Sequence, residues 1–123
     1  MKSWDQDRAL DAVGGDAQFL SELAGIFCAA SSTLLKSLEE SIAARASHET
    51  ADTAHLMWSS ARSFSVPEVE EAALAVEQMA RRKKFDGIRS AFDELRQEIV
   101  QLTEALAKFR NGHSSLSGAG ERH

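Results

Sequence analysis

The feature that most constrains the fold is a run of apolar residues in the C-terminal part of the chain, spaced alternately by four and three positions. These residues are Ile88, Phe92, Leu95, Ile99, Leu102, Leu106 and Phe109. Positions with this spacing lie along one side of an α-helix and form the seam of a helical bundle or coiled coil. A helix with such a seam needs partner helices to cover it, so the sequence predicts an all-α fold.

Three further segments carry apolar residues at helical spacing and can supply those partners. The first of them follows Asp16 and runs to about Arg45, the second follows Ser47, and the third follows Ser65 and carries a basic patch, residues 81–84, near its end. Their predicted core positions are Leu20, Leu23, Phe27, Ala30, Leu34, Leu38, Ala51, Ala54, Trp58, Ala61, Val69, Ala72, Val76 and Met79. One proline and no tyrosine in the chain also favour helices over strands. The sequence therefore predicts an antiparallel four-helix bundle with a short additional N-terminal helix.

Polar residues and glycines mark the expected helix ends. Ser3 is expected to start the short first helix, Asp16 to cap the second, and Ser47 and Ser65 to cap the third and fourth. Gly14 is expected to end the first helix. The last helix is expected to stop at residues 111–112, Asn-Gly. We therefore expect a folded domain over residues 1–110 and a disordered tail over residues 111–123. Most of this tail, HSSLSGAGERH, is small and polar and has no core-forming pattern.

Composition narrows the classes of function. The 123 residues carry a net charge of -5, which argues against a general nucleic-acid binder. A lone cysteine, Cys28, excludes an internal disulfide and a thiolate metal cluster. No signal peptide or run long enough to span a bilayer is expected. These features favour a cytoplasmic protein without a membrane segment, and the initiating Met makes a stand-alone protein plausible.

A stripe of polar residues follows one face of the predicted third helix, again in steps of four and three. Its members are His48, Asp52, His55, Ser59 and Arg62. His55 lies at the centre, beside apolar Ala54, so one flank of its ring is expected to face the core and the other water. A neutral imidazole is a good nucleophile near neutral pH and can hold a phosphoryl group as a phosphoramidate. No metal site is expected, because no Glu-x-x-His pair of the di-iron type is present.

Two motifs in this order resemble the histidine-containing phosphotransfer (HPt) family over about residues 3–108. The first, residues 4–27, combines an aromatic-Asp start, a short helix, Gly-Gly-Asp and the pattern Phe-Leu-x-x-Leu-x-x-x-Phe. The second, residues 53–66, resembles the family's Ala-His-x-Leu-Lys-Gly-Ser-Ser phosphorylation motif. In it Ala54, His55, Met57, Ser60 and Phe64 are in register. The sequence departs from the family pattern in having Trp58 in place of lysine, Ser59 in place of glycine, and Ser65 at the later glycine.

The resemblance implies a phosphoprotein of two-component signal transduction, with His55 as the phosphoacceptor in a phosphorelay. Asp52, Trp58, Ser59 and Arg62 would then form the phosphoryl environment and docking surface, on the exposed side of the second and third helices. Arg62 is two turns from His55, roughly 10 Å along the axis, and a long guanidinium could lean back toward the phosphoryl group.

The implied partners are a response-regulator receiver domain, a hybrid histidine kinase, or both, and not nucleic acid or a membrane. A phosphocarrier of this kind has no turnover of its own, so it is not an enzyme. It needs no cofactor, because the Mg²⁺ belongs to the partner receiver. We expect a monomer.

Two other interpretations stay open at this point. The first, based on the missing lysine and glycine of the family motif, is a degenerate interaction module that binds a receiver or kinase without accepting phosphate. A plain structural bundle with an accidental resemblance is the second alternative. Whether Trp58 lies over the imidazole or beside it discriminates between an inert and an active site.

Overall fold

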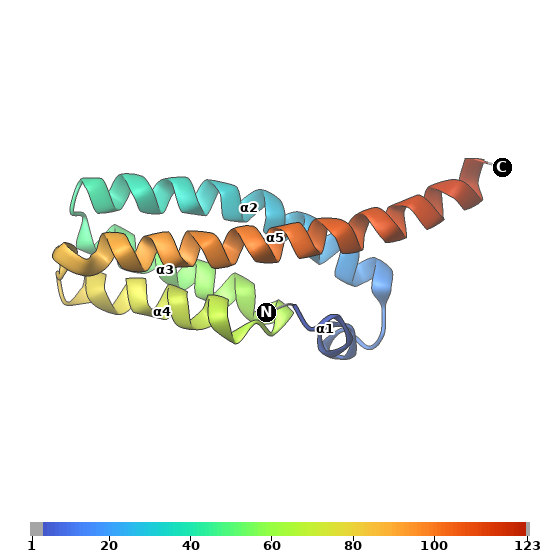
Figure 1. Cartoon of the computed structure of the whole chain (residues 1–123), viewed down its shortest axis with the longest axis horizontal. Helices are drawn as coiled ribbons and strands as arrows, with labels where there is room; N and C mark the ends of the chain where they lie inside the picture. Colours follow the sequence, from blue (N-terminus) through green and yellow to red (C-terminus); the bar gives the residue numbers. More distant parts are fainter. Residues whose placement is uncertain (1–3, 123) are drawn as a thin grey trace.

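A computed structural model describes the backbone of residues 4–122 and the side chains of residues 4–112. The elements are α1 (Gln6–Ala12), α2 (Ala17–Ala43), α3 (Ser47–Ala61), the 3₁₀ turn η1 (Arg62–Phe64), α4 (Pro67–Arg81) and α5 (Phe85–Arg122). Within residues 4–122 every regular element is helical (Figure 1). The predicted all-α fold, with a short first helix before four longer ones, is confirmed.

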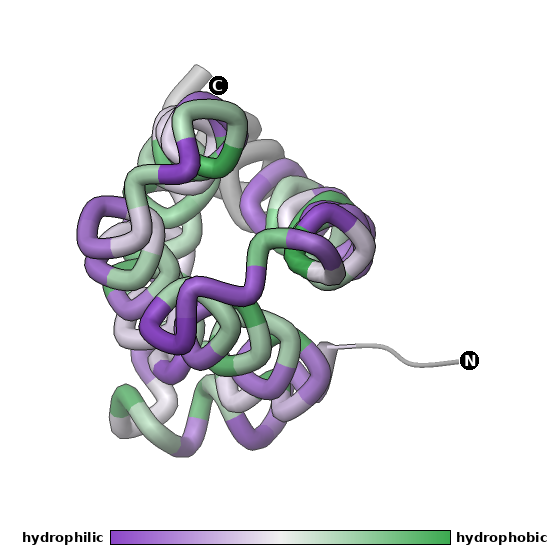
Figure 2. Tube along the Cα trace, turned by 90° about the vertical axis from the view of Figure 1, so that its left-hand side faces the viewer, coloured by the Kyte–Doolittle hydropathy of each residue, from purple (hydrophilic) through white to green (hydrophobic). Residues whose placement is uncertain are grey.

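The four long helices form a closed antiparallel bundle. α2 packs on α3, α3 on α4, α4 on α5, and α5 returns to α2. Figure 2, viewed along the length of the molecule, shows the four helices arranged around a shared interior. Short connections between them enforce the up-and-down order, because only antiparallel neighbours can be joined by a few residues. This arrangement places α3 between α2 and α4, with its outer side open to solvent.

The interior is built largely from the predicted apolar stripes. All seven residues of the α5 seam are buried, from Ile88 to Phe109. Most predicted positions of the other helices are also buried, or partly buried and packed against the core. Ala30 is the exception, because it is exposed on the outer side of α2. Burial of apolar surface on all four helices is therefore what holds the bundle together.

The N-terminal segment is fastened to the end of the bundle by aromatic contacts. The indole Nε1 of Trp4 donates a hydrogen bond to the carbonyl oxygen of Phe64, at 3.1 Å. The Trp4 ring also meets the rings of Phe64 and Phe109 edge-on, at centroid distances of 6.4 and 5.5 Å. These contacts hold the segment before α1 against η1 and α5, and they cover the end of the core at that point.

The helix starts follow only part of the expected pattern. Asp16 caps α2, and its carboxylate accepts a hydrogen bond from the Phe19 amide at 3.0 Å, as predicted. The expected serine caps are wrong. α3 and α4 begin after Ala46 and Val66, and neither position provides a side-chain cap. Ser65 instead adopts a left-handed conformation that ends η1, with φ 55°. α1 begins at Gln6 with Asp5 as its cap, and Ser3 lies outside the described residues.

The far end of α5 differs from the expectation. The sequence predicts a stop at residues 111–112, but the helix continues to Arg122 and projects beyond the other helices (Figure 1). Glycine and asparagine disfavour a helix interior only by up to about 1 kcal/mol each, so they mark an end without enforcing it. The predicted helix end is therefore corrected. A folded domain over residues 1–110 followed by a disordered tail over residues 111–123 stays a prediction.

One helix also corrects the expectation about membrane-spanning segments. Within the described residues, α2 is long and apolar enough to cross a membrane by length and composition alone. One such helix is weak evidence for a span, because a mostly buried core helix of a soluble protein and a signal sequence near the N-terminus both pass the same test. Here α2 packs along α3 and α5 and contributes Leu20, Phe27 and Leu38 to the core.

Candidate functional site

The polar stripe of α3 lies on the surface as the spacing predicts. All five of its members have exposed side chains; the first four lie on α3, and Arg62 is the first residue of η1. The residues on the opposite side of α3, Ala51, Ala54 and Met57, are fully buried. The His55 side chain is 49% exposed. Its ring is therefore backed by the bundle on one flank and open to water on the other.

The inner flank of His55 contacts a carboxylate from the neighbouring helix. The Nδ1 atom of His55 lies 3.2 Å from Oε1 of Glu77, which is on α4. The Glu77 side chain is only 10% exposed. Glu77, Ser31 and Thr50 are the buried polar residues in the described part of the chain, and Glu77 alone among them is ionisable. A buried carboxylate is costly unless it is paired, so its position beside the imidazole is strongly specified.

Arg81 completes the pairing of this carboxylate. Its Nε and Nη2 atoms donate hydrogen bonds of 3.0 and 2.8 Å to Oε2 of Glu77, one turn earlier on α4. Burial alone would raise the pKa of Glu77. The hydrogen bonds from Arg81 and His55, and the charges of these two residues, outweigh that effect and hold the pKa below its ordinary value. Glu77 is therefore ionised near neutral pH and accepts hydrogen bonds from both sides.

Arg81 also approaches α3 from its other side. Its Nη2 atom lies 4.0 Å from Oδ1 of Asp52, and Oδ2 of Asp52 lies 3.1 Å from Nε2 of His48. A continuous line of charged and polar groups therefore runs along the α3–α4 boundary. Asp52, predicted as a site residue, contacts the arginine that holds Glu77 and does not contact His55 itself.

The outer neighbours of His55, Trp58 on α3 and Arg62 at the start of η1, form a stack with its ring. The Trp58 ring lies one turn away, with its centroid 5.1 Å from that of the imidazole and an angle of 36° between the planes. The guanidinium carbon of Arg62 lies 4.9 Å from the Trp58 ring centroid. The Trp58 ring is therefore tilted against the imidazole, and the His55 side chain stays 49% exposed. Arg62 is held on the indole, and Ser59 is exposed on the same stripe.

Glu77, which contacts the inner flank of His55, and Arg81, which binds Glu77, were not predicted as site residues. A signal for them is present in the sequence. Glu77 falls four positions after Ala73 and three before Ala80, so a carboxylate occupies a core position of the α4 stripe. Arg81 follows Glu77 by four, the spacing of a helical ion pair. The pattern shows that Glu77 needs a partner, but not that α3 provides one.

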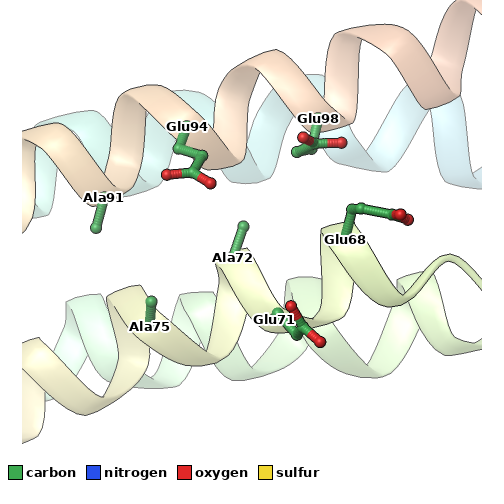
Figure 3. A pocket seen from close by; sticks show the side chains of 7 residues that line it. All are labelled: Glu68, Glu71, Ala72, Ala75, Ala91, Glu94 and Glu98. Carbon is green, nitrogen blue, oxygen red and sulfur yellow. The ribbon is translucent and has the colours of Figure 1, made fainter. Parts of the chain in front are cut away.

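A second polar feature lies on the other side of α4. Four glutamates and three alanines line a hollow between α4 and α5, and Figure 3 shows their side chains along the two facing helices. They are Glu68, Glu71, Ala72, Ala75, Ala91, Glu94 and Glu98. No positively charged side chain lines this hollow. In the described residues, no three His, Cys, Asp or Glu side chains are arranged so that together they could hold a metal ion. The hollow is separate from His55, which faces the α3 side of α4.

These features define a class of protein. The bundle presents a single half-exposed histidine whose one ring nitrogen is bound by a buried carboxylate and whose remaining edge faces solvent. Such a group can act as a nucleophile or an acid-base group.

Comparison with protein families identifies the class further. Residues 22–110 match the family model of the Hpt domain. The match covers more than half of the chain, and the chain therefore belongs to the Hpt domain family. It includes α3 and the motif around His55, whereas the Gly-Gly-Asp segment before residue 22 lies outside it. No curated protein and no solved structure matches the chain.

Hpt domains are, as a family, phosphocarrier modules without turnover of their own, so membership supports an involvement in a phosphorelay at the level of the family. The predicted family is confirmed, and an accidental resemblance of a purely structural bundle is excluded. The role of each site residue, and whether this member accepts phosphate, belong to the proposal that follows.

Proposed function

We propose that this protein relays a phosphoryl group between response-regulator receiver domains by forming phosphohistidine at His55. The observation that carries the proposal is the geometry of this side chain. It is half exposed, lies in register with the family's phosphorylation motif, and has one nitrogen bound to Glu77. His48 is also exposed, but its ring pairs only with Asp52 on its own helix.

The transfer step needs little from the carrier. A phospho-aspartate of the partner receiver approaches, and a lone pair of the imidazole attacks phosphorus in line. The new N–P bond forms as the P–O bond breaks, and the electron pair leaves with the aspartate carboxylate. The Mg²⁺ that neutralises the phosphoryl oxygens belongs to the receiver, so this chain needs no cofactor. The reverse reaction passes the group to another receiver.

The position of Trp58 supports an active carrier over a degenerate module. A tryptophan lying flat over the imidazole would block the approach of phosphorus. Here the ring planes are tilted by 36° and the His55 side chain stays 49% exposed. The family's lysine charge is absent at this position, but Arg62 and Arg81 place two guanidinium groups on the flanks of the site. We propose that these arginines supply the favourable electrostatics.

The docking surface for the receiver is proposed to centre on α3. Leu56 follows His55 directly and is 56% exposed, and Ile26 of α2 is 66% exposed. Phe19 is a further exposed apolar residue, two turns before Ile26 on the same face of α2. Exposed aromatic and aliphatic side chains are favoured at protein interfaces. We propose that the receiver contacts these residues together with Asp52, Trp58, Ser59 and Arg62, and that the protein acts in the cytoplasm as a monomer.

The experiment that tests this proposal is phosphoryl transfer from a panel of phosphorylated receiver domains to the parent protein and to His55→Gln. We expect acid-labile phosphate on the parent and none on the variant. Binding of a receiver without transfer would contradict the carrier role and favour the degenerate interaction module. Circular dichroism of His55→Gln should match the parent, so that loss of phosphate is not loss of fold.

A further inference from the structure

We propose that one end of the bundle, which we call the basic end, steers an acidic face of the receiver domain toward His55. The cations of the basic end are Arg45, Arg81, Arg82, Lys83 and Lys84. This role rests on the proposed function, because it concerns the partner that the function requires. It belongs to residues at the ends of α2 and α4, outside the phosphorylation motif on α3.

The two connections that supply these cations lie close together. The α2–α3 and α4–α5 connections are at the same end of the bundle (Figure 1). The guanidinium carbon of Arg45 lies 5.7 Å from the ring centroid of Phe85, so the first connection touches the start of α5. Within the described residues, Arg82, Lys83 and Lys84 are exposed and form no ion pair. Their charges are therefore available to a partner.

The backbone of both connections indicates that these charges are kept at a cost. Arg45 and Lys83 adopt the left-handed conformation, with φ 54° and 57°. Each directly follows a helix end, a position where glycine is favoured because a Cβ atom crowds the backbone there. The helix dipole attracts cations near this end, but Arg81 within the last turn of α4 already meets that preference. The fold alone would therefore be better served by glycine at both positions.

Arg81 connects the basic end to the site. Its Nη2 atom donates to Glu77 and lies 4.0 Å from Oδ1 of Asp52 on α3. Lys83 follows Glu77 by six positions, roughly 9 Å along the helix axis. The Debye length is about 8 Å at physiological ionic strength, so the field of the basic end reaches the surface around His55. The basic end thus provides positive charge that the motif on α3 lacks, since Trp58 replaces the lysine of the family pattern.

The other half of α4 carries the opposite charge. Glu68 and Glu71 lie near its start, and together with Glu94 and Glu98 of α5 they line the hollow of Figure 3. An acidic surface is repelled at the hollow and attracted at the basic end. The whole chain has a net charge of -5, so an acidic partner is attracted only in this local field. The charge distribution therefore orients the partner as well as attracting it.

The partner that fits is a receiver domain with an acidic surface beside its phosphorylated aspartate. Phosphoryl groups on proteins carry a charge of about -1.5 to -2 at neutral pH, which adds to that surface. Exposed charges outside the contact area act mainly on the rate of association, because they bias the encounter before any contact forms. The basic end therefore sets how fast the receiver reaches His55 and leaves the transfer step itself unchanged.

The first measurement is the association rate of a fluorescently labelled receiver domain that binds the parent, followed by stopped flow at increasing salt. In Lys84→Glu we expect the rate at low salt to fall about threefold, a modest part of the tenfold or larger range of electrostatic steering. The difference should disappear near 1 M salt, where the Debye length is about 3 Å. The matched control is Lys108→Glu, an equal change of charge at an exposed position of α5 near the opposite end. It should keep the rate within about 1.5-fold.

The second measurement separates steering from folding. Lys83→Gly removes a charge of the basic end and places glycine where the backbone favours it. We expect the urea midpoint of Lys83→Gly to equal or exceed that of the parent, while association at low salt slows about twofold. A variant that is at least as stable and yet binds more slowly has not lost its rate through loss of fold.

Three results would overturn the proposal. The first is an unchanged association rate in both Lys83→Gly and Lys84→Glu, and the second is an equal loss of rate in Lys108→Glu. The third is binding to vesicles of anionic lipid that requires Lys83 and Lys84 while receiver association does not, because the basic end would then face a membrane.

The two proposals fail in different ways. If receivers phosphorylate His55 but Lys84→Glu leaves their association rate unchanged, the carrier function stands and the steering role is wrong. If association depends on Lys84 and on salt but no phosphate reaches His55, the steering role stands and the carrier function is wrong.

Discussion

The two histidines of α3 lie on the same face of the same helix, two turns apart, yet their surroundings differ. His48 is 84% exposed and pairs with Asp52, which is 55% exposed and one turn away on the same helix. His55 is 49% exposed and meets Glu77, which is 10% exposed and comes from another helix. A local pair between exposed groups is screened by water and contributes little. A pair that crosses the α3–α4 boundary to a buried carboxylate fixes the ring in place.

Periodicity alone therefore does not select the functional histidine. Sequence spacing places both rings on one face, and only the packing of α4 against α3 separates them. We expect four measurable consequences, given below in decreasing order of size.

The largest difference is expected in phosphoryl acceptance. His55→Gln should abolish phosphorylation by a phosphorylated receiver, because glutamine has no nucleophilic nitrogen. His48→Gln should keep the rate within about twofold, since His48 only contributes an exposed ion pair. Rates are measured by the appearance of acid-labile phosphate. Equal losses in both variants would remove the distinction between the two histidines.

The second difference is expected in stability. Glu77→Ala should lower the free energy of unfolding by about 1–2 kcal/mol, because it removes charge-assisted hydrogen bonds to Arg81 and His55. The expected loss of unfolding free energy is modest because the two partners of Glu77, His55 and Arg81, are each about half exposed. Asp52→Ala should change stability by less than about 0.5 kcal/mol. Urea denaturation followed by circular dichroism measures both, and a larger effect from Asp52→Ala would reverse the comparison.

The third prediction concerns the decline in folding stability at acid pH. The folded pKa of Glu77 lies below its ordinary value of 4.5, so the ionised form favours the folded state. Its contribution is complete above that value and is lost as the pH falls through the lower folded pKa. Glu77→Gln should therefore flatten the decline in stability below pH 4.5, whereas the control Glu71→Gln should keep the slope of the parent. Identical slopes in Glu77→Gln and the parent would show that Glu77 has no shifted pKa.

The smallest effect is expected at the outer end of the stripe. Arg62→Ala should cost about 0.5 kcal/mol, because an exposed cation–π contact is weak. Its effect is best read from the emission of Trp58 in a Trp4→Phe background, since the chain has two tryptophans. A shift in Trp58 emission with little change in stability is expected. No spectral change would show that the guanidinium does not stay on the indole in solution.

The sequence was sufficient for the architecture but not for the inner half of the site. Regular spacing predicts the α5 seam and the polar stripe of α3, because both depend only on helix geometry. The cap at Asp16 was also predictable from the sequence. The predicted caps at Ser47 and Ser65 were wrong, because the backbone conformation of a short connection depends on the packing around it. Glu77 was missed because its partner lies 22 positions away, and helix periodicity contains no information about which faces of two helices meet.

The most direct test of the account is to locate the phosphoryl group. The parent protein would be phosphorylated by a receiver domain, digested at alkaline pH to preserve phosphohistidine, and the modified residue identified by tandem mass spectrometry. We expect phosphate on His55 and none on His48, although both are exposed on the same face of α3. Phosphate on His48 or on any residue other than His55, or on none with every receiver tested, would contradict it.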